Sequence, residues 1–495
     1  MKRFTRRATL ALGGVALGWG AARSFRRNLP VYDGTERPSV LSSGGIMNDA
    51  SGLSPTPIQE HLTFSETADD TLISALRREL SEAASEARPV SVGAARHSMG
   101  GQAIPRDGKA ITFNNGAIEL DSANQTYRVH AGARWSQVIA ALDPQGWSPA
   151  VMQSNNDFGV AATFSVNAHG WPVPFGPMGA TVRSLRLLLP SGEVVTCSPV
   201  ENTELFGLAM GGYGLIGIII DLIVDMVPNR RLVPSFNQLA ADDFATAFRT
   251  ALDDPAVTMA YGRLNVERDR FFEQALLVTY REDTDQSDLP PAAGSGWLSH
   301  LASRLYRAQL GNETFKSFRW WNETTLGPAV GGGATTRNSL INEPVVTLDD
   351  RDPNRTDILH EYFVSFEAFG AFLEACRAVI PSSYQEFLNV TLRYVAQDDQ
   401  SILSYATTPR IAAVMSFSQE MTTRAEADMQ RMTEILIDRI AEIGGAYYLP
   451  YRPHARVDQM ASVYKGASGF ASRKRQIDPR LVLRNNLWDS YLDRL

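Results

Sequence analysis

The pattern of apolar and polar positions predicts a helix followed by several short strands near the start of the chain. Residues 71–87 carry apolar side chains at spacings of three and four, with charged residues on the opposite face, which is typical of an amphipathic helix. Short apolar runs over 89–94, 110–113 and 126–131 predict strands. Short strands with few helices favour an α+β fold over a doubly wound sheet.

Further short helices and strands are predicted in the next part of the chain. It predicts a helix over 135–142, a hairpin formed by 184–189 and 193–196, and a nearly continuous apolar strand over 216–227 that ends at Pro228. No G-x-G-x-x-G motif lies between a strand and a helix, which disfavours a nicotinamide-binding domain.

Longer elements are expected from about residue 231 onward. They include a helix over 366–379, a strand over 414–419 and a helix over 424–443. The stretch 296–324 is rich in Trp, Leu, Arg and Phe. It fits an ordinary packed helix, and peripheral contact with a membrane surface is the alternative.

Length, charge and cysteine content narrow the class of protein. A chain of 495 residues is too long for one ordinary core, so two domains are expected. The formal net charge of −7 argues against nucleic acid as a partner. Cys197 and Cys376 are the only cysteines, which predicts neither a disulfide framework nor a cysteine-based metal site.

Three loops or strand ends rich in small residues carry the strongest chemical signal. The first is Arg96-His97-Ser98-Met99-Gly100-Gly101-Gln102, directly after a predicted strand. The second spans 163–171 and contains His169-Gly170, and the third is the glycine-rich strand 210–219. Loops of this kind leave backbone N–H groups free to bind phosphate. Three of them in order indicate a large phosphate-containing cofactor.

These segments resemble the FAD-binding half of the vanillyl-alcohol-oxidase superfamily, the PCMH-type flavoproteins. Its sugar-alcohol and aldonolactone oxidases are most similar, and its cytokinin dehydrogenases are more distant. The matching motifs are Arg96-His97-Ser98, His169-Gly170 and Gly214-Leu215-Ile216-Gly217-Ile218-Ile219. The resemblance implies FAD as the cofactor, bonded covalently to His97. It also implies that the following residues bind the cofactor: Val92, Gly93, Ala94, Ala95, Arg96, Ser98, Gln102, Thr163, Asn167, His169, Gly170, Gly217, Ile218 and Ile219.

The same resemblance implies a division of the chain into a PCMH-type FAD-binding domain, built in two parts, over 54–230 and an α/β substrate domain over 231–450. The substrate domain would place an antiparallel sheet over the flavin. Residues 451–495 would return to the FAD domain. Residues 28–53, rich in Pro, Gly and Ser, are expected to form a linker.

The first 27 residues resemble a twin-arginine export signal. Arg6-Arg7 precede an apolar stretch over 10–22 that is shorter and less apolar than a typical transmembrane helix. This predicts export of the folded protein by the Tat route, to the periplasm or to a membrane-tethered position.

Candidate catalytic residues lie in the second half. The segment 389–399 resembles the E-x-R-x-V-x-x-D-D pattern of the polyol and lactone oxidases, which implies that Arg393 binds a substrate oxygen or stabilises reduced flavin. Thr391 stands where those oxidases carry glutamate. Glu361, in an apolar strand, and His454, in an R-P-H stretch similar to that of alditol oxidases, are alternative general bases.

The function implied by the resemblance is FAD-dependent oxidation of a CH–OH group in a sugar, polyol or aldonolactone. Oxygen or a respiratory acceptor would then reoxidise the flavin. Oxidation of a CH–NH group, as in cytokinin dehydrogenases, remains open because Thr391 replaces the glutamate. A flavin-binding protein without catalysis is the third possibility.

Overall fold

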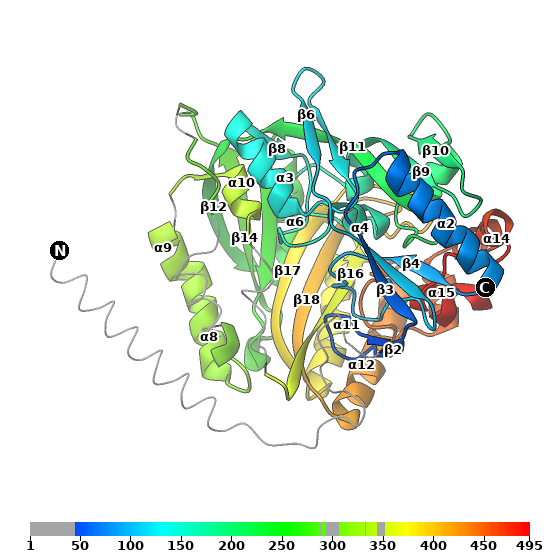
Figure 1. Ribbon diagram of the computed structural model, residues 1–495. Helices are drawn as coiled ribbons and strands as arrows, with labels where there is room; N and C mark the ends of the chain where they lie inside the picture. Colours follow the sequence, from blue (N-terminus) through cyan, green and yellow to red (C-terminus); the bar gives the residue numbers. More distant parts are fainter. Residues whose placement is uncertain (1–44, 288, 294–305, 332, 344–351) are drawn as a thin grey trace.

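A small parallel sheet opens the folded part of the chain (Figure 1). The computed structural model describes residues 45–287, 289–293, 306–331, 333–343 and 352–495. In the parallel sheet, β5 (Lys109–Phe113) lies between β3 (Glu60–Phe64) and β4 (Val90–Val92). The connecting helix α2 (Asp70–Glu86) begins at Asp69, whose carboxylate accepts the N–H groups of Thr71 and Leu72 and so caps the helix.

The end of the predicted linker is folded, which corrects that prediction for residues 45–53. Strand β1 (Ile46–Met47) pairs with β2 (Thr56–Pro57), and Asn48, Asp49 and Ser51 are buried between them. The Asp49 carboxylate accepts the N–H of Gly101 at 2.7 Å, which ties this segment to the loop of His97. The predicted export signal and the earlier part of the linker lie outside the described residues.

A second sheet is antiparallel throughout and has the strand order β10-β9-β11-β7-β6, with β8 paired to the end of β11. Helix α3 (Trp135–Leu142) buries Trp135, Val138 and Ile139 beneath it, as the sequence predicts. The strands and remaining helices of this part are β6 (Ile118–Asp121), β7 (Thr126–His130), β8 (Trp147–Pro149), α4 (Val160–Ser165), β9 (Val182–Leu188), β10 (Val194–Cys197), α5 (Thr203–Ala209) and β11 (Ile218–Pro228).

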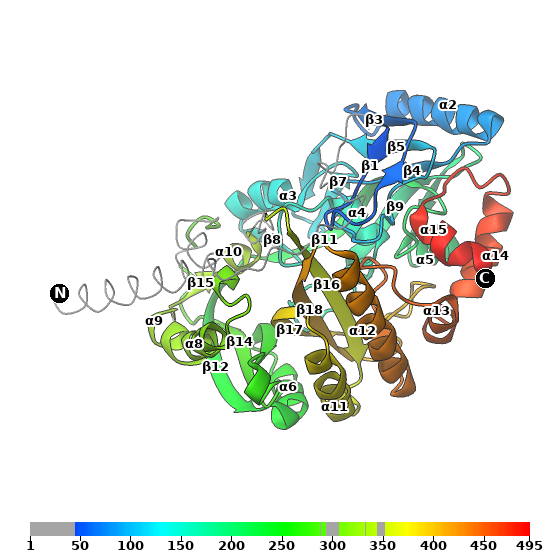
Figure 2. The ribbon, with the colours of Figure 1, turned by 90° about the horizontal axis from the view of Figure 1, so that it is seen from below.

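An eight-stranded antiparallel sheet follows, in the order β15-β12-β14-β13-β17-β18-β16-β19. Helices α6, α11 and α12 cover one of its faces (Figure 2). The described elements of this part are β12 (Arg231–Ala240), α6 (Phe244–Leu252), β13 (Val257–Leu264), β14 (Gln274–Glu282), α8 (Glu313–Trp321), α9 (Gly327–Gly331), β15 (Thr335–Thr336), α10 (Arg337–Ile341), β16 (Arg355–Val364), α11 (Phe369–Val379), β17 (Glu386–Val395), β18 (Arg410–Glu420), α12 (Thr423–Glu442) and β19 (Ala446–Tyr447).

The chain end packs against the first part of the fold. Helices α13 (Val457–Val463), α14 (Ala467–Ile477) and α15 (Asn486–Ser490) follow β19. Residues 482–484 then run alongside β4, where the N–H of Val90 bonds to the Val482 carbonyl at 2.7 Å. The described elements are thus a mixture of helices, a parallel sheet and antiparallel sheets, which confirms the predicted α+β class.

The Trp-rich stretch 296–324 is described from residue 306 onward. There, Tyr306 donates a hydrogen bond to Ser416 of β18 at 3.0 Å, and Lys316 of α8 is buried, whereas Trp321 is exposed. This part therefore packs on the eight-stranded sheet. None of the helices that the structure describes has the length and apolar character to cross a bilayer.

Candidate functional site

A deep cavity lies where the two smaller sheets meet the open face of the eight-stranded sheet. Helix α4 and the first residues of β11 form part of its wall. The eight-stranded sheet, called the large sheet below, forms the opposite wall with Leu359, Glu361, Arg393 and Val414. Most of the predicted cofactor-binding residues line it: Val92, Gly93, Ala94, Ala95, Arg96, His97, Ser98, Gln102, Thr163, His169, Gly217, Ile218 and Ile219.

The loop that follows β4 leaves a row of donors facing this cavity. Among the described residues, the backbone N–H groups from Ala94 to Ser98 donate no hydrogen bond to the protein. Arg96 is in a left-handed conformation with φ of 51°, and its buried Nε also has no partner. Only Arg96 of these residues is buried and the others are half-buried, but a run of unpaired N–H groups in a cavity wall fits an anionic, phosphate-containing ligand. The residues present therefore suit a dinucleotide such as FAD.

His97 stands at the centre of this loop. Its ring packs on Phe158 with centroids 4.2 Å apart, and burial lowers its pKa, which favours the neutral imidazole. Gln102 fixes the other end of the loop, because its side chain accepts the N–H of Gly100 at 2.9 Å and donates to the carbonyls of Leu449 and Tyr451, both at 2.8 Å. The loop is thus anchored at its end, and His97 lines the cavity.

Asn167 and Gly170, also predicted to bind the cofactor, are not among the residues that line the cavity. Asn167 has a φ of 45° and organises its loop by accepting the N–H of Gly179 at 2.9 Å and donating to Asp398 at 3.1 Å. At Gly170 the close backbone approach is to the protein itself, since an added Cβ would lie 2.1 Å from the Met152 carbonyl oxygen.

A buried polar cluster on the large sheet faces the cavity. Glu361 of β16 is 3% exposed and accepts a short hydrogen bond from Nε2 of His169. Its second oxygen accepts the hydroxyl of Tyr451 at 3.2 Å. Arg393 of β17 donates to the Ser154 hydroxyl at 2.9 Å, while its buried Nε is free among the described residues. Burial lowers the pKa of Arg393, and the charge of Glu361 opposes that shift.

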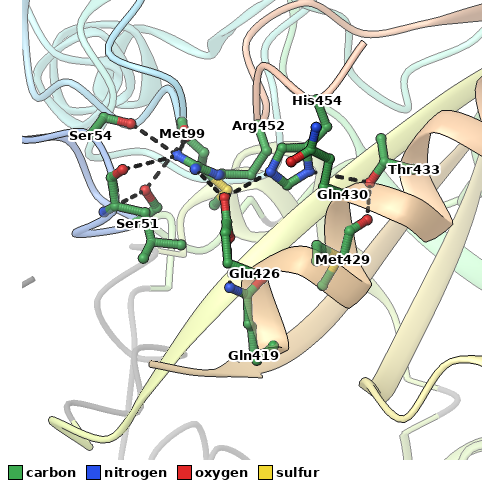
Figure 3. A network of polar contacts seen from close by, with 12 residues as sticks. Ser51, Ser54, Met99, Gln419, Glu426, Met429, Gln430, Thr433, Arg452 and His454 are labelled. Carbon is green, nitrogen blue, oxygen red and sulfur yellow. Dashed lines mark hydrogen bonds and ion pairs between the residues drawn. The ribbon is translucent and has the colours of Figure 1, made fainter. Parts of the chain in front are cut away.

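His454 does not join this cluster, so the structure gives no support to its predicted role as the base. Figure 3 shows its ring between Glu426 and Thr433 of α12, at 2.8 Å and 3.4 Å. Arg452 completes the network through an ion pair with Glu426 and a hydrogen bond to the Met99 carbonyl at 3.1 Å. Because α12 covers the other face of the sheet, His454 is held on the side opposite to Glu361.

This network predicts that the fold weakens on acidification. His360 is fully buried beside Thr433, and burial, followed by the nearby His454, lowers its pKa to about 3. Below about pH 6.5 the imidazole of His360 binds a proton in the unfolded chain but not in the folded chain. The free energy of unfolding should therefore fall by about 1.4 kcal/mol per pH unit as the pH is lowered. Burial raises the pKa of Glu426, but His454 and Arg452 outweigh it and hold that pKa well below its usual range. Stabilisation by Glu426 is thus also lost as the pH falls below about 4.5.

Denaturant unfolding at a series of pH values between 7 and 4 measures this effect. His360→Asn should reduce the slope of unfolding free energy against pH by about one proton. An unchanged slope in that variant would show that the buried histidine stays protonated on folding.

Several residues that line the cavity were not identified from the sequence. Ser154, Phe158, Tyr213 and Tyr451 line the cavity, although none was predicted to do so. Tyr451 directly precedes the R-P-H stretch, so the segment that resembles alditol oxidases reaches the cavity through Tyr451. Tyr213 has a φ of 55° within the glycine-rich run, a conformation that the composition of this turn could have suggested.

Comparison with known proteins identifies the first part of the chain. Residues 72–198 match the family described as FAD binding domain. The L-galactono-1,4-lactone dehydrogenase of Brassica oleracea mitochondria is 24% identical over 223 residues, which is 44% of this chain and 37% of that protein. A putative D-arabinono-1,4-lactone oxidase of Neurospora crassa is 31% identical over 114 residues, 23% of this chain and 20% of that protein. Cytokinin dehydrogenase 8 of Oryza sativa subsp. indica is 33% identical over 208 residues, 36% of this chain and 38% of that protein.

In each of these relatives the matched region covers less than two fifths of the relative's own length. The matches nevertheless fall on the superfamily that the motifs indicated, and they confirm an FAD-binding domain in this chain.

Proposed function

We propose that this chain is an FAD-dependent oxidoreductase that removes hydride from a CH–OH carbon of a sugar-, polyol- or aldonolactone-like substrate. The observation that carries the proposal is the cluster of Glu361, His169, Tyr451 and Arg393 facing a cavity that the FAD-binding loops also line. Bound FAD would supply the hydride acceptor. The matched lactone oxidase and lactone dehydrogenase support this substrate class.

Residues of the chain would accept the substrate proton, orient the acceptor and bind negative charge. Glu361 accepts the proton of the substrate hydroxyl, while His169 and Tyr451 orient its carboxylate. Arg393, which remains a cation, binds the substrate oxygen or the negative charge that develops during reduction. The eight-stranded sheet then acts as a substrate domain over the FAD-binding part.

Oxidation of a CH–NH group is the second candidate, and the matched cytokinin dehydrogenase favours it. The surroundings of Glu361 argue against it for a protonated amine, because Arg393 places a positive charge beside the reacting centre. We further propose that the chain is exported by the Tat route and that oxygen or a respiratory acceptor reoxidises the flavin.

Covalent attachment of FAD through His97 is part of this proposal. Its position within the row of free N–H donors and the lowered pKa of its imidazole suit a residue that would hold the flavin through one ring nitrogen. A denaturing gel of the purified full chain, viewed for flavin fluorescence, tests it. We expect a fluorescent band for the wild type and for His61→Ala, a control histidine on β3, and a dark band for His97→Ala. A fluorescent His97→Ala band would contradict the linkage.

A further inference from the structure

Two arginines share the cavity-side face of the large sheet next to Glu361. Arg263 of β13 lies directly opposite Thr391 of β17, and Arg393 follows two residues later on the same strand. Side chains alternate along a strand, so these three residues point to one side. Gly262 pairs with Leu392, and these two neighbours of the three residues point to the other side of the sheet. On that side, a Cβ added to Gly262 would lie 2.3 Å from the ring of Phe244 of α6. Arg263 and Arg393 thus lie on the face opposite to α6, which is the face that Arg393 shares with the cavity.

Neither arginine forms an ion pair with a carboxylate within the part of the chain that the structure describes. Arg263 donates to the Thr391 hydroxyl, and its guanidinium lies over the ring of Tyr261 at 5.2 Å. Arg393 donates to Ser154 and keeps a buried, unpaired Nε. The charge of Arg263 adds to burial in lowering the pKa of Arg393, so the two cations are within electrostatic reach of each other.

The neighbouring charges compensate for this pair only in part. The charge of Glu361 offsets part of the charge of Arg393, but Glu361 forms its hydrogen bonds with His169 and Tyr451 and with neither arginine. A third arginine near the same strand, Arg319, behaves differently because Glu323 pairs with it at 2.8 Å. Two half-buried cations close together with neither in an ion pair are unfavourable, and a guanidinium fork matches the oxygens of a carboxylate or a phosphate.

The wall beside the pair is aromatic. Trp171, two residues after His169, packs edge-on against Tyr261 at 5.3 Å and against Tyr280 at 5.6 Å. This wall limits access of water to the guanidinium groups and strengthens their interaction with an anion. The arginine pair is therefore adjacent to the proposed proton acceptor and shielded on one side.

We propose that Arg263 and Arg393 together bind an oxyanion of the substrate, a carboxylate or a phosphate, so that the CH–OH donor is an acidic sugar or hydroxy acid and not a neutral polyol. This inference rests on the proposed function and specifies its substrate class. The oxyanion would take up the free donors of both arginines and so place a neighbouring hydroxyl toward Glu361. A protonated amine at the same place would be repelled by both cations.

Two matched series of compounds test the inference on the flavin-loaded full chain. The first is D-sorbitol, D-gluconate, D-sorbitol 6-phosphate and D-glucamine, and the second is glycerol, glycerate and glycerol 3-phosphate. Perturbation of the flavin absorbance measures binding, and anaerobic bleaching measures reduction. We expect the anions to bind at least about tenfold more tightly than the neutral members of each series. The comparison of gluconate or glycerate with the phosphates distinguishes the two oxyanions.

Three variants locate the binding site. Arg263→Gln should weaken anion binding by about tenfold or more and leave the neutral compounds unaffected. Thr391→Glu places a carboxylate beside both arginines and should have the same effect, whereas Thr391→Gln, of the same size without the charge, should not. Arg439→Gln, an exposed arginine on α12, is the control for general charge.

The outcomes distinguish failure of the oxyanion site from failure of the proposed oxidoreductase function. Bleaching by neutral compounds with no binding of any anion would overturn the inference and leave the proposed function standing. Anion binding that depends on Arg263, with no bleaching by any donor, would support the oxyanion site and count against the oxidoreductase. Anion binding that Arg263→Gln leaves unchanged would also overturn the inference.

Discussion

Replacing Glu361 by glutamine is expected to slow reduction of the bound flavin by about 10² to 10⁴-fold, because general acid–base catalysis contributes on that order. Glutamine keeps the size of the side chain and a partner for Tyr451, but it cannot accept the substrate proton. Glu361 is the only carboxylate that lines the cavity among the described residues. Anaerobic stopped-flow measurement of flavin bleaching gives the rate directly.

The effect should be confined to the chemical step. Glu361→Gln should bind as much flavin as the wild type, since Glu361 lies on the large sheet and not in the FAD-binding loops. Tyr451→Phe, which removes one hydrogen bond that orients the carboxylate, should cost only about tenfold. A rate in Glu361→Gln close to that of the wild type would assign proton removal to another group.

A large effect on stability is expected from Gly170→Ala. The added Cβ would lie 2.1 Å from the backbone oxygen of Met152 and 2.9 Å from Pro172 Cδ, and a backbone oxygen cannot move aside cheaply. Overpacking of this kind costs about 1–3 kcal/mol or more. Because His169 and Trp171 flank the glycine, flavin reduction should also slow.

Thermal unfolding with a matched glycine separates this contact from a general effect of the substitution. Gly370, near the start of α11, has no atom within 4 Å of an added Cβ, so Gly370→Ala should leave Tm unchanged or raise it slightly. We expect Gly170→Ala to lower Tm by at least about 2–4 °C, the shift that 1 kcal/mol produces in a large domain. Equal Tm values in the two variants would show that the loop relaxes around the new methyl group.

Local patterns predicted much of the fold because burial imposes a period on each element. The helix α3 has the predicted bounds, and β11 and α12 differ from prediction by at most two residues at each end. Strand alternation also placed Thr391 and Arg393 on one face correctly. The failure at residues 45–53 has a physical cause, because Asn48, Asp49 and Ser51 are polar but are buried with hydrogen bonds to one another and to Gly101.

The site was less predictable because it is assembled across the sequence. His169 and Glu361 are 192 residues apart, so no local pattern reveals their contact. The R-P-H stretch identified a segment that reaches the cavity through Pro450 and Tyr451, yet His454 points toward Glu426 on the opposite side. Arg263 belongs to no recognisable motif, and only the pairing of β13 with β17 brings it beside Arg393.

The most direct measurement is an anaerobic titration of the purified full chain, after its flavin content has been determined from the visible spectrum. We expect a yellow protein with FAD bound in equimolar amount, and bleaching by an aldonolactone or by an acidic sugar but not by an amine. A colourless protein that takes up no added FAD would contradict the central proposal. A yellow protein that no CH–OH donor bleaches would contradict its catalytic part.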